Sequence, residues 1–118
     1  MRLRNEIWVQ AYLRQVFAAG AAAYVARRGD GDAGAIFITV RSGDRTRLFA
    51  PALPATADDG ERRWEERASG AGSGPSQIAE RLAREASIDP DIWLIDVEDR
   101  DGRDFLGDAA ERSPSPGR

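Results

Sequence analysis

The sequence predicts an α+β protein in which two helices pack on one mostly antiparallel sheet of about five to six strands. Three observations support this fold class: two segments with helical spacing of apolar residues, several short segments rich in β-branched and aromatic residues, and turn-forming residues between them. A chain of 118 residues is long enough to bury one hydrophobic core. We predict a single domain over residues 1–106 and, where the composition turns polar, a disordered tail over residues 107–118.

The first helix is predicted over residues 6–19. An apolar row begins at Trp8 with a spacing of four, and an adjacent row completes a broad face for burial. Asn5 is placed to cap the N-terminus of this helix, and Gly20 to end it in the left-handed conformation.

Three strands are predicted next, over residues 24–28, 34–41 and 45–50. Their content of β-branched and aromatic side chains is high, and the middle strand is apolar on both faces. The glycine and aspartate cluster at residues 29–32 indicates a hairpin between the first two strands, and residues 42–44 indicate a second hairpin. The three strands would then form a meander.

The middle of the chain is less regular. Residues 51–60 have the composition of a loop. Residues 61–67 suit an exposed edge strand or a short helix about equally, and we favour the strand. Residues 68–74 are flexible by composition, and Pro75 suits the first position of a second helix over residues 76–86.

The clearest predicted strand covers residues 92–97 and alternates apolar side chains on two faces. Asp101-Gly102 is a strong signal for a two-residue hairpin turn. The chain would return through residues 103–106 as a short final strand.

Several blocks of the sequence together resemble domain-of-unknown-function family 1491, a family of small bacterial proteins. They are residues 6–14, residues 27–30 with 33–38, the helical segment 78–86, and residues 89–106 with their DPDIWLIDVEDR run. The resemblance implies a cytoplasmic bacterial protein. It does not imply an enzyme, and it supplies no catalytic or binding residue to carry over. Members often carry lysine at the position of Thr39 and histidine at that of Asp104, so this chain departs from the pattern there.

The composition removes many catalytic mechanisms. The sequence contains no cysteine, histidine or lysine, so all 17 basic side chains are arginine. These absences exclude a cysteine nucleophile, a disulfide framework, a Ser-His-Asp triad, histidine metal sites and a lysine Schiff base. Paired carboxylates, a carboxylate-bound Mg²⁺ and an arginine clamp on an anion remain. We expect no cofactor.

No stretch of the sequence approaches the roughly eighteen uninterrupted apolar residues of a membrane span, so we expect no membrane partner. Arg2, Arg4 and the small residues 21–23 have features of a signal peptide, but polar side chains interrupt the segment between them. The cytoplasm is the expected location.

Carboxylates gather around the last strand and the turn after it, at Asp96, Glu98, Asp99, Asp101 and Asp104. Their spacing fails the register of a calcium-binding loop. Strand alternation places Asp96 and Glu98 on one face, where they could bind Mg²⁺ or share a proton. The alternative, favoured by the hairpin turn, is a solvated strand end.

The glycine-rich segment of residues 29–34 has the composition of a phosphate-binding loop. Such loops follow a strand and open a helix, whereas this one opens a strand, which favours a plain hairpin loop.

Arginines and one tryptophan form the candidate interaction surface, which comprises Arg27, Arg28, Arg62, Arg63 and Trp64. Guanidinium groups beside an indole suit phosphates, carboxylates or RNA bases. Acidic side chains lie among these arginines and the net charge is -3, which disfavours nucleic acid as a partner. Trp64 is either an interface hot spot or the inward residue of an edge strand, whereas Trp8 and Trp93 are expected in the core.

The leading hypothesis is a non-enzymatic interaction module that pairs with itself or another protein. It would use the strand around Trp64 and the adjacent sheet edge. Two alternatives stay open: an anion-, nucleotide- or RNA-binding protein that uses Arg62, Arg63 and Trp64, and a small carboxylate- or metal-dependent enzyme centred on Asp96 and Glu98.

Overall fold

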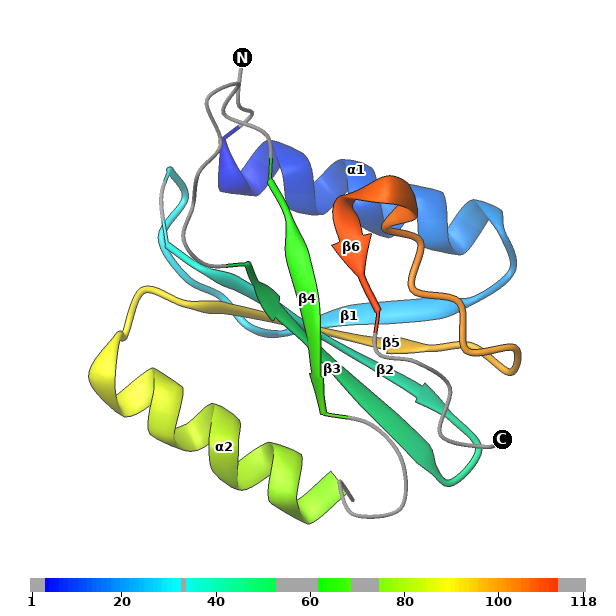
Figure 1. Cartoon of the computed structure of the whole chain (residues 1–118). Helices are drawn as coiled ribbons and strands as arrows, with labels where there is room; N and C mark the ends of the chain where they lie inside the picture. Colours follow the sequence, from blue (N-terminus) through cyan, green and yellow to red (C-terminus); the bar gives the residue numbers. More distant parts are fainter. Residues whose placement is uncertain (1–3, 33, 53–61, 69–74, 113–118) are drawn as a thin grey trace.

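The computed structural model describes residues 4–32, 34–52, 62–68 and 75–112. In chain order its elements are α1 (Asn5–Ala18), β1 (Ala22–Arg27), β2 (Ile36–Ser42), β3 (Arg45–Pro51), β4 (Trp64–Ala68), α2 (Pro75–Ile88), β5 (Trp93–Glu98), the 3-10 turn η1 (Gly107–Ala109) and β6 (Ala110–Glu111). The two helices lie on opposite sides of one sheet (Figure 1). The predicted α+β fold is confirmed.

The described strands form a sheet in the order β1-β5-β2-β3-β4-β6. Three of its five strand pairs are antiparallel, while β2 pairs with β5 and β4 pairs with β6 in parallel. The predicted hairpin between β1 and β2, and with it the meander, is wrong because β5 lies between these strands. Both β2 and the start of β5 are apolar on two faces, so both are buried best in the middle of the sheet.

The other predicted strands are close to the observed ones. The hairpin of β2 and β3 is confirmed, with Ser42 paired to Arg45 across a turn in which Gly43 has a φ of +64°. The polar segment predicted as a strand is β4, and the second helix begins at Pro75 as expected. Residues 53–60 of the predicted loop lie outside the described part of the chain, and so does the segment 69–74.

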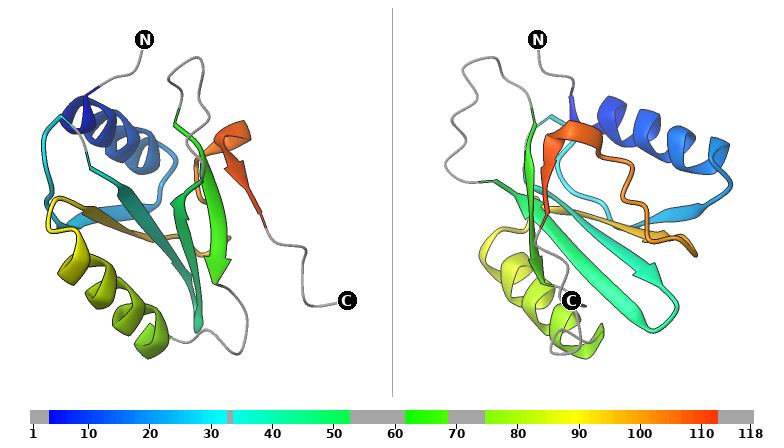
Figure 2. Two further views of the ribbon diagram at one scale, coloured as in Figure 1. Left: turned by 60° about the vertical axis from the view of Figure 1, so that its left-hand side comes forward. Right: turned by 45° about the vertical axis from the view of Figure 1, so that its right-hand side comes forward.

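Each helix covers its own apolar cluster. Val9, Tyr12 and Val16 of α1 pack on one sheet face with Ile38, Phe49, Trp64, Trp93 and Ile95. Ile78 and Leu82 of α2 pack on the other face with Phe37, Leu48 and Ala50. Figure 2 shows that α2 runs under only part of the sheet, which leaves the α2 side of β1 and β5 less covered.

Asn5 is not the helix cap that the sequence suggested. It is the first residue of α1, and its buried amide Nδ2 donates to the carbonyl oxygens of Asp30 and Gly34 at 3.1 and 3.2 Å. The two N–H groups of an amide can join separate loop carbonyls, which a capping oxygen does not do. Gly20 ends α1 with a φ of +89°, as predicted.

The end of the described chain differs from the prediction in two ways. Residues 103–106 form no strand, because the Asp99 carboxylate accepts the Arg103 N–H at 2.8 Å and turns the chain away from β5. Residues 107–112, predicted to be part of a disordered tail, instead form η1 and β6 and end beside β4. Residues 113–118 lie outside the described part.

Candidate functional site

Trp64 lies in the core rather than on an interaction surface. Its side chain is 3% exposed, its ring centroid is 4.9 Å from that of Trp8, and its Nε1 donates to the Ile36 carbonyl at 2.8 Å. Strand β6 pairs with β4 at Trp64 and Glu65, so β4 is not an edge there. The interpretation of Trp64 as an inward-facing core residue is correct, and its interpretation as an exposed hot spot is wrong.

The four arginines of the candidate surface lie at two separate places. Arg27 and Arg28 are at the end of β1, where Arg27 donates to the Pro90 carbonyl at 3.1 Å and Arg28 pairs with Glu6. Arg62, with its guanidinium 5.9 Å from the Trp8 ring, and the exposed Arg63 precede β4, which three strands separate from β1. The structure therefore does not bring these arginines into one patch.

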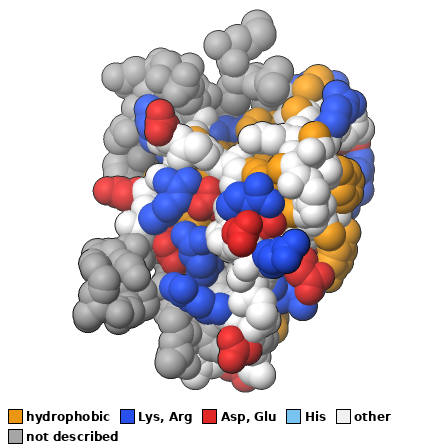
Figure 3. Space-filling view, turned by 90° about the vertical axis from the view of Figure 1, so that its right-hand side faces the viewer, with side chains coloured by type: hydrophobic (Ala, Val, Ile, Leu, Met, Phe, Trp, Pro, Cys, Tyr) orange, Lys and Arg blue, Asp and Glu red, His pale blue; other side chains and the backbone are white. Residues whose placement is uncertain are grey.

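Charges of both signs alternate on the face that carries β6 and the turn after β5. Figure 3 shows blue and red side chains interleaved there. They include the ion pairs Arg103–Asp99 and Arg112–Asp104, each at 2.8 Å, and Arg47–Glu66 at 3.0 Å. A surface on which arginine is neutralised in this way lacks the dominant positive field that nucleic-acid binding needs.

Two carboxylates of the predicted acidic cluster serve in these ion pairs. Hydrogen bonds from the Arg103 side chain lower the pKa of Asp99 to about 2. Burial acts to raise the pKa of Asp104, but hydrogen bonds from Arg112 and the Leu106 N–H outweigh it, so this pKa is lowered. Both groups are ionised at neutral pH and stabilise the fold.

The glycine-rich loop makes hydrogen bonds with other segments of the protein. The Asp30 carbonyl accepts from the indole of Trp93 at 2.6 Å, and the Asp30 N–H donates to the Asp91 carbonyl at 3.0 Å. A Cβ at Gly29 or Gly34 would overlap the Asp91 carbonyl. The glycines therefore allow a close backbone approach, and the loop is a connection rather than a phosphate cradle.

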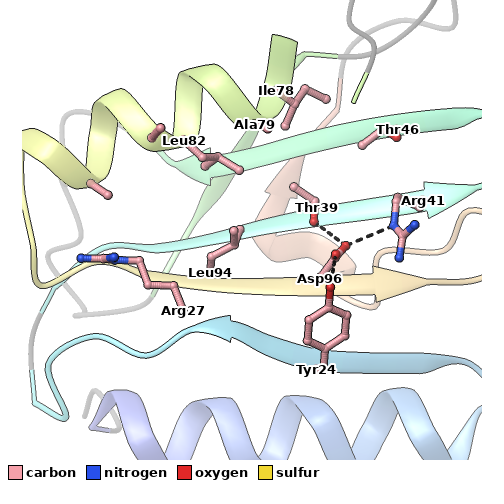
Figure 4. A pocket seen from close by; sticks show the side chains of 12 residues that line it. Tyr24, Arg27, Thr39, Arg41, Thr46, Ile78, Ala79, Leu82, Leu94 and Asp96 are labelled. Atoms are coloured by element: carbon pink, nitrogen blue, oxygen red, sulfur yellow. Dashed lines mark hydrogen bonds and ion pairs between the residues drawn. The ribbon is translucent and has the colours of Figure 1, made fainter. Parts of the chain in front are cut away.

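A groove that the sequence did not predict lies between α2 and the sheet (Figure 4). Its volume is about 480 Å³. Its walls combine apolar side chains of α2 with polar side chains of four strands: Tyr24, Arg27, Thr39, Arg41, Thr46, Ile78, Ala79, Leu82, Ala83, Ala86, Leu94 and Asp96. The groove forms because α2 packs over β2 and β3 and leaves the α2 side of β5 and β1 open.

Asp96 is the centre of the polar floor of this groove. Its Oδ1 accepts from the Thr39 hydroxyl at 2.8 Å and its Oδ2 accepts from the Tyr24 hydroxyl at 2.9 Å. The Arg41 Nε lies 3.5 Å from Oδ1. The hydrogen bond to Asp96 raises the pKa of Tyr24, so this hydroxyl stays protonated as a donor. Asp96 thus lies in a polar cluster on one face of β5, and its partners there are an arginine and two hydroxyl groups.

Comparisons with known proteins decide the family. A protein-family model described as "Protein of unknown function (DUF1491)" matches residues 3–107. The chain belongs to this family. The resemblance predicted from the sequence is therefore confirmed.

Solved structures of DUF1491 proteins share the fold. The crystal structure of a DUF1491 protein from Caulobacter crescentus is 38% identical, covers 94% of this chain and 99% of its own, and has a TM-score of 0.78. An NMR structure of a DUF1491 protein from the same organism is 39% identical over 94% and 98%, with a TM-score of 0.79. Protein Atu0922 from A. tumefaciens is 42% identical over 84% and 87%, with a TM-score of 0.73. No curated protein matches the chain.

Two further findings bear on what this DUF1491 protein can bind. Among residues 4–32, 34–52, 62–68 and 75–112, no group of three or more aspartates or glutamates is arranged to hold a metal ion. Within the same ranges, no helix is long and apolar enough to cross a membrane.

A weak signal for the groove is present in the sequence. Strand alternation places Leu94 beside Asp96 on one face of β5, and Thr39 beside Arg41 on one face of β2. What the sequence does not show is that Thr39 and Asp96 are partners across a parallel strand pair. That pairing joins segments 57 residues apart in the chain, and only the assembled sheet brings them together.

Proposed function

We propose that this DUF1491 protein is a non-enzymatic interaction module that forms a homodimer by pairing the β1 strands of two copies. The supporting observation is the position of β1 at the end of the sheet, where β5 pairs with one of its sides and no described strand pairs with the other. An edge strand presents unpaired backbone N–H and C=O groups to which a further strand can add.

The β1 edge lacks the devices that proteins use to protect such strands. Residues 22–26 contain no charge and no proline, and the bulge between Val25 and Arg27 affects only the far end. The two-residue β6, by contrast, ends the sheet on the other side with a very short strand.

Apolar surface lies next to this edge. Phe17 and Glu6 lie on the same side of α1, because their spacing is close to three whole helical turns. Glu6 pairs with Arg28, which comes directly after β1. The flank that carries Phe17 therefore faces the side of β1. Phe17 is 55% exposed and Tyr24 of β1 is 54% exposed, so a paired strand would bury apolar area on both faces.

The charges at the two ends of β1 suit antiparallel self-pairing. Ala22, at the start of β1, is paired with the exposed Glu98 of β5, and the exposed Arg27 is at the end of β1. In an antiparallel pair the end of one β1 lies beside the start of the other, which brings Arg27 toward Glu98 of the second copy. Twofold symmetry repeats this contact.

This proposal moves the interface from β4, where Trp64 is buried, to the opposite edge of the sheet. The module would act in the cytoplasm of a bacterium, as expected from the family resemblance. No observation favours RNA or a metal-dependent reaction over self-association.

The test is the mass of the full chain in solution, measured by sedimentation equilibrium. We expect a dimer for the natural sequence and a monomer for Ala26→Lys, because a lysine on the edge opposes strand pairing. Ala79→Lys, which adds the same charge on exposed α2, should remain dimeric. A monomeric natural protein, or a dimer that persists in Ala26→Lys, would contradict the proposal.

Charge reversal gives a second, independent measurement. Arg27→Glu and Glu98→Arg should each weaken the dimer, and the double variant should recover it. Loss of the dimer without recovery in the double variant would show that the strands pair in another register or not at all.

A further inference from the structure

We infer that the groove between α2 and the sheet binds an organic monoanion, a carboxylate on an apolar body, and that Arg41 binds the carboxylate. This inference goes beyond the homodimer: the groove shares Tyr24 and Arg27 with the proposed interface, but the carboxylate is bound by Arg41, which the interface does not use. Arg41 lies on β2, which β5 separates from the β1 edge.

Arg41 has donor groups that the protein does not use. Its Nε is buried and has no hydrogen-bond partner. The contact with Asp96 Oδ1 is 3.5 Å, and that oxygen already accepts from Thr39 at 2.8 Å. The Arg41 side chain is 40% exposed and lies at one end of the groove, as Figure 4 shows. The Nε faces Asp96 and is closed to a ligand, but the two Nη groups make no hydrogen bond with the described residues and can bind a carboxylate through two parallel hydrogen bonds.

The groove also provides an apolar surface for the body of a ligand. Ile78, Leu82 and Leu94 line it together with three alanines of α2 at positions 79, 83 and 86. The alanines leave space that a larger side chain at these positions would fill. The volume of about 480 Å³ is within the usual range of small-molecule sites.

The charge of the lining favours an anion with one negative charge. Arg27 and Arg41 contribute two positive charges and Asp96 one negative charge, so the lining carries one net positive charge. Both oxygens of Asp96 accept hydrogen bonds from protein hydroxyl groups, which leaves this carboxylate poorly placed to bind a cation. A doubly charged phosphate would be repelled more strongly by Asp96 than a carboxylate would.

The test is a titration of the ¹⁵N-labelled full chain with octanoate, followed by the backbone amide signals in NMR spectra. We expect saturable shifts at Thr39, Leu94 and Asp96. Octanol, which lacks the charge, and octyl phosphate, which carries more charge, should bind more weakly. The same titration of monomeric Ala26→Lys should still show saturable octanoate binding that Arg41→Gln weakens, which separates this inference from the homodimer.

Matched variants test each part of the groove. Arg41→Gln should weaken octanoate binding at least tenfold, whereas Arg45→Gln removes an exposed arginine outside the groove and should leave it unchanged. Ala83→Leu should abolish binding by filling the groove, whereas Glu80→Leu adds a leucine to α2 outside it. Well-dispersed spectra show that each variant is folded.

Three outcomes would overturn the inference. They are the absence of saturable shifts, an affinity that Arg41→Gln and Ala83→Leu do not lower, and octanol or octyl phosphate binding as tightly as octanoate. Octanoate binding that Arg41→Gln and Ala83→Leu weaken and their controls do not would support it.

Discussion

Trp64 and its charged neighbours form part of the core, although the local sequence is polar. The indole N–H reaches the Ile36 carbonyl two strands away, and Glu66 is buried against Arg47 through hydrogen bonds of 3.0 and 3.2 Å. A charged side chain in a strand usually indicates solvent exposure, so the pattern of residues 61–67 suggested a surface. The ion-pair partner of Glu66 is on β3 and is not adjacent in the sequence.

Replacing Trp64 with phenylalanine should destabilise the protein by about 1–3 kcal/mol, because the change leaves the buried Ile36 carbonyl without its donor. The measurement is the free energy of unfolding in urea. Trp8→Phe is the control, since Trp8 is only half-buried, and it should cost less. Equal losses in the two variants would show that ring volume, and not the hydrogen bond, determines the effect.

Asp99 should make folding stability depend on pH in the acid range. Its pKa is about 2 in the folded protein, against 3.8 ordinarily, because Arg103 stabilises the ionised form. The stabilisation is fully present above about pH 4 and is lost as the pH falls toward 2.

The variant Asp99→Asn should therefore be less stable at neutral pH, and its free energy of unfolding should decline less than that of the natural protein as the pH falls. Urea unfolding at a series of pH values measures both effects, and Asp101→Asn, which changes an exposed carboxylate, is the control. An unchanged acid profile in Asp99→Asn would contradict the role assigned to this pair.

At the scale of elements, the sequence predicted both helices and five of the six described strands but not all their partners. Local periodicity and turn residues located α1, α2, β2 and β3. The same signals suggested a hairpin after β1, because Gly29–Gly34 resembles a turn. Gly29 and Gly34 instead fit against the backbone at Asp91, a contact between distant segments that local rules do not include.

Gly34 provides a direct test of that close approach. Gly34 and Gly43 both have positive φ values, +110° and +64°, but only at Gly34 would a Cβ overlap backbone atoms. Gly43→Ala should cost about 1 kcal/mol from the conformation alone. Gly34→Ala should cost about 2–4 kcal/mol because the clash adds to that strain. Similar losses, measured by urea unfolding, would show that the loop moves away from Asp91 at little cost.

At the scale of the whole molecule, both helices depend on one shared sheet. The strands β2 and β3 contribute side chains to the α1 side and to the α2 side. The groove follows from this arrangement, because α2 covers the middle of the sheet and not its β1 end, and no described strand pairs with the outer side of β1. The sequence could not show this, since it depends on the order of strands.

We therefore expect the two layers to unfold together. All three tryptophans lie on the α1 side, so fluorescence reports that layer, while far-UV circular dichroism reports both helices. Leu82→Ala removes core volume under α2 and should cost about 2–4 kcal/mol, with coincident transitions by both methods. A change in circular dichroism that precedes the change in fluorescence would show that α2 unfolds separately.

The position of β5 between β1 and β2 also has a consequence for synthesis on the ribosome. Translation produces β1, β2 and β3 well before β5, yet the first two cannot join the same sheet until β5 has emerged. A growing chain that stops before Trp93 therefore has two strands without their central neighbour. Such unpaired strands are prone to aggregation, so truncated products of this protein should be recognised by chaperones or degraded.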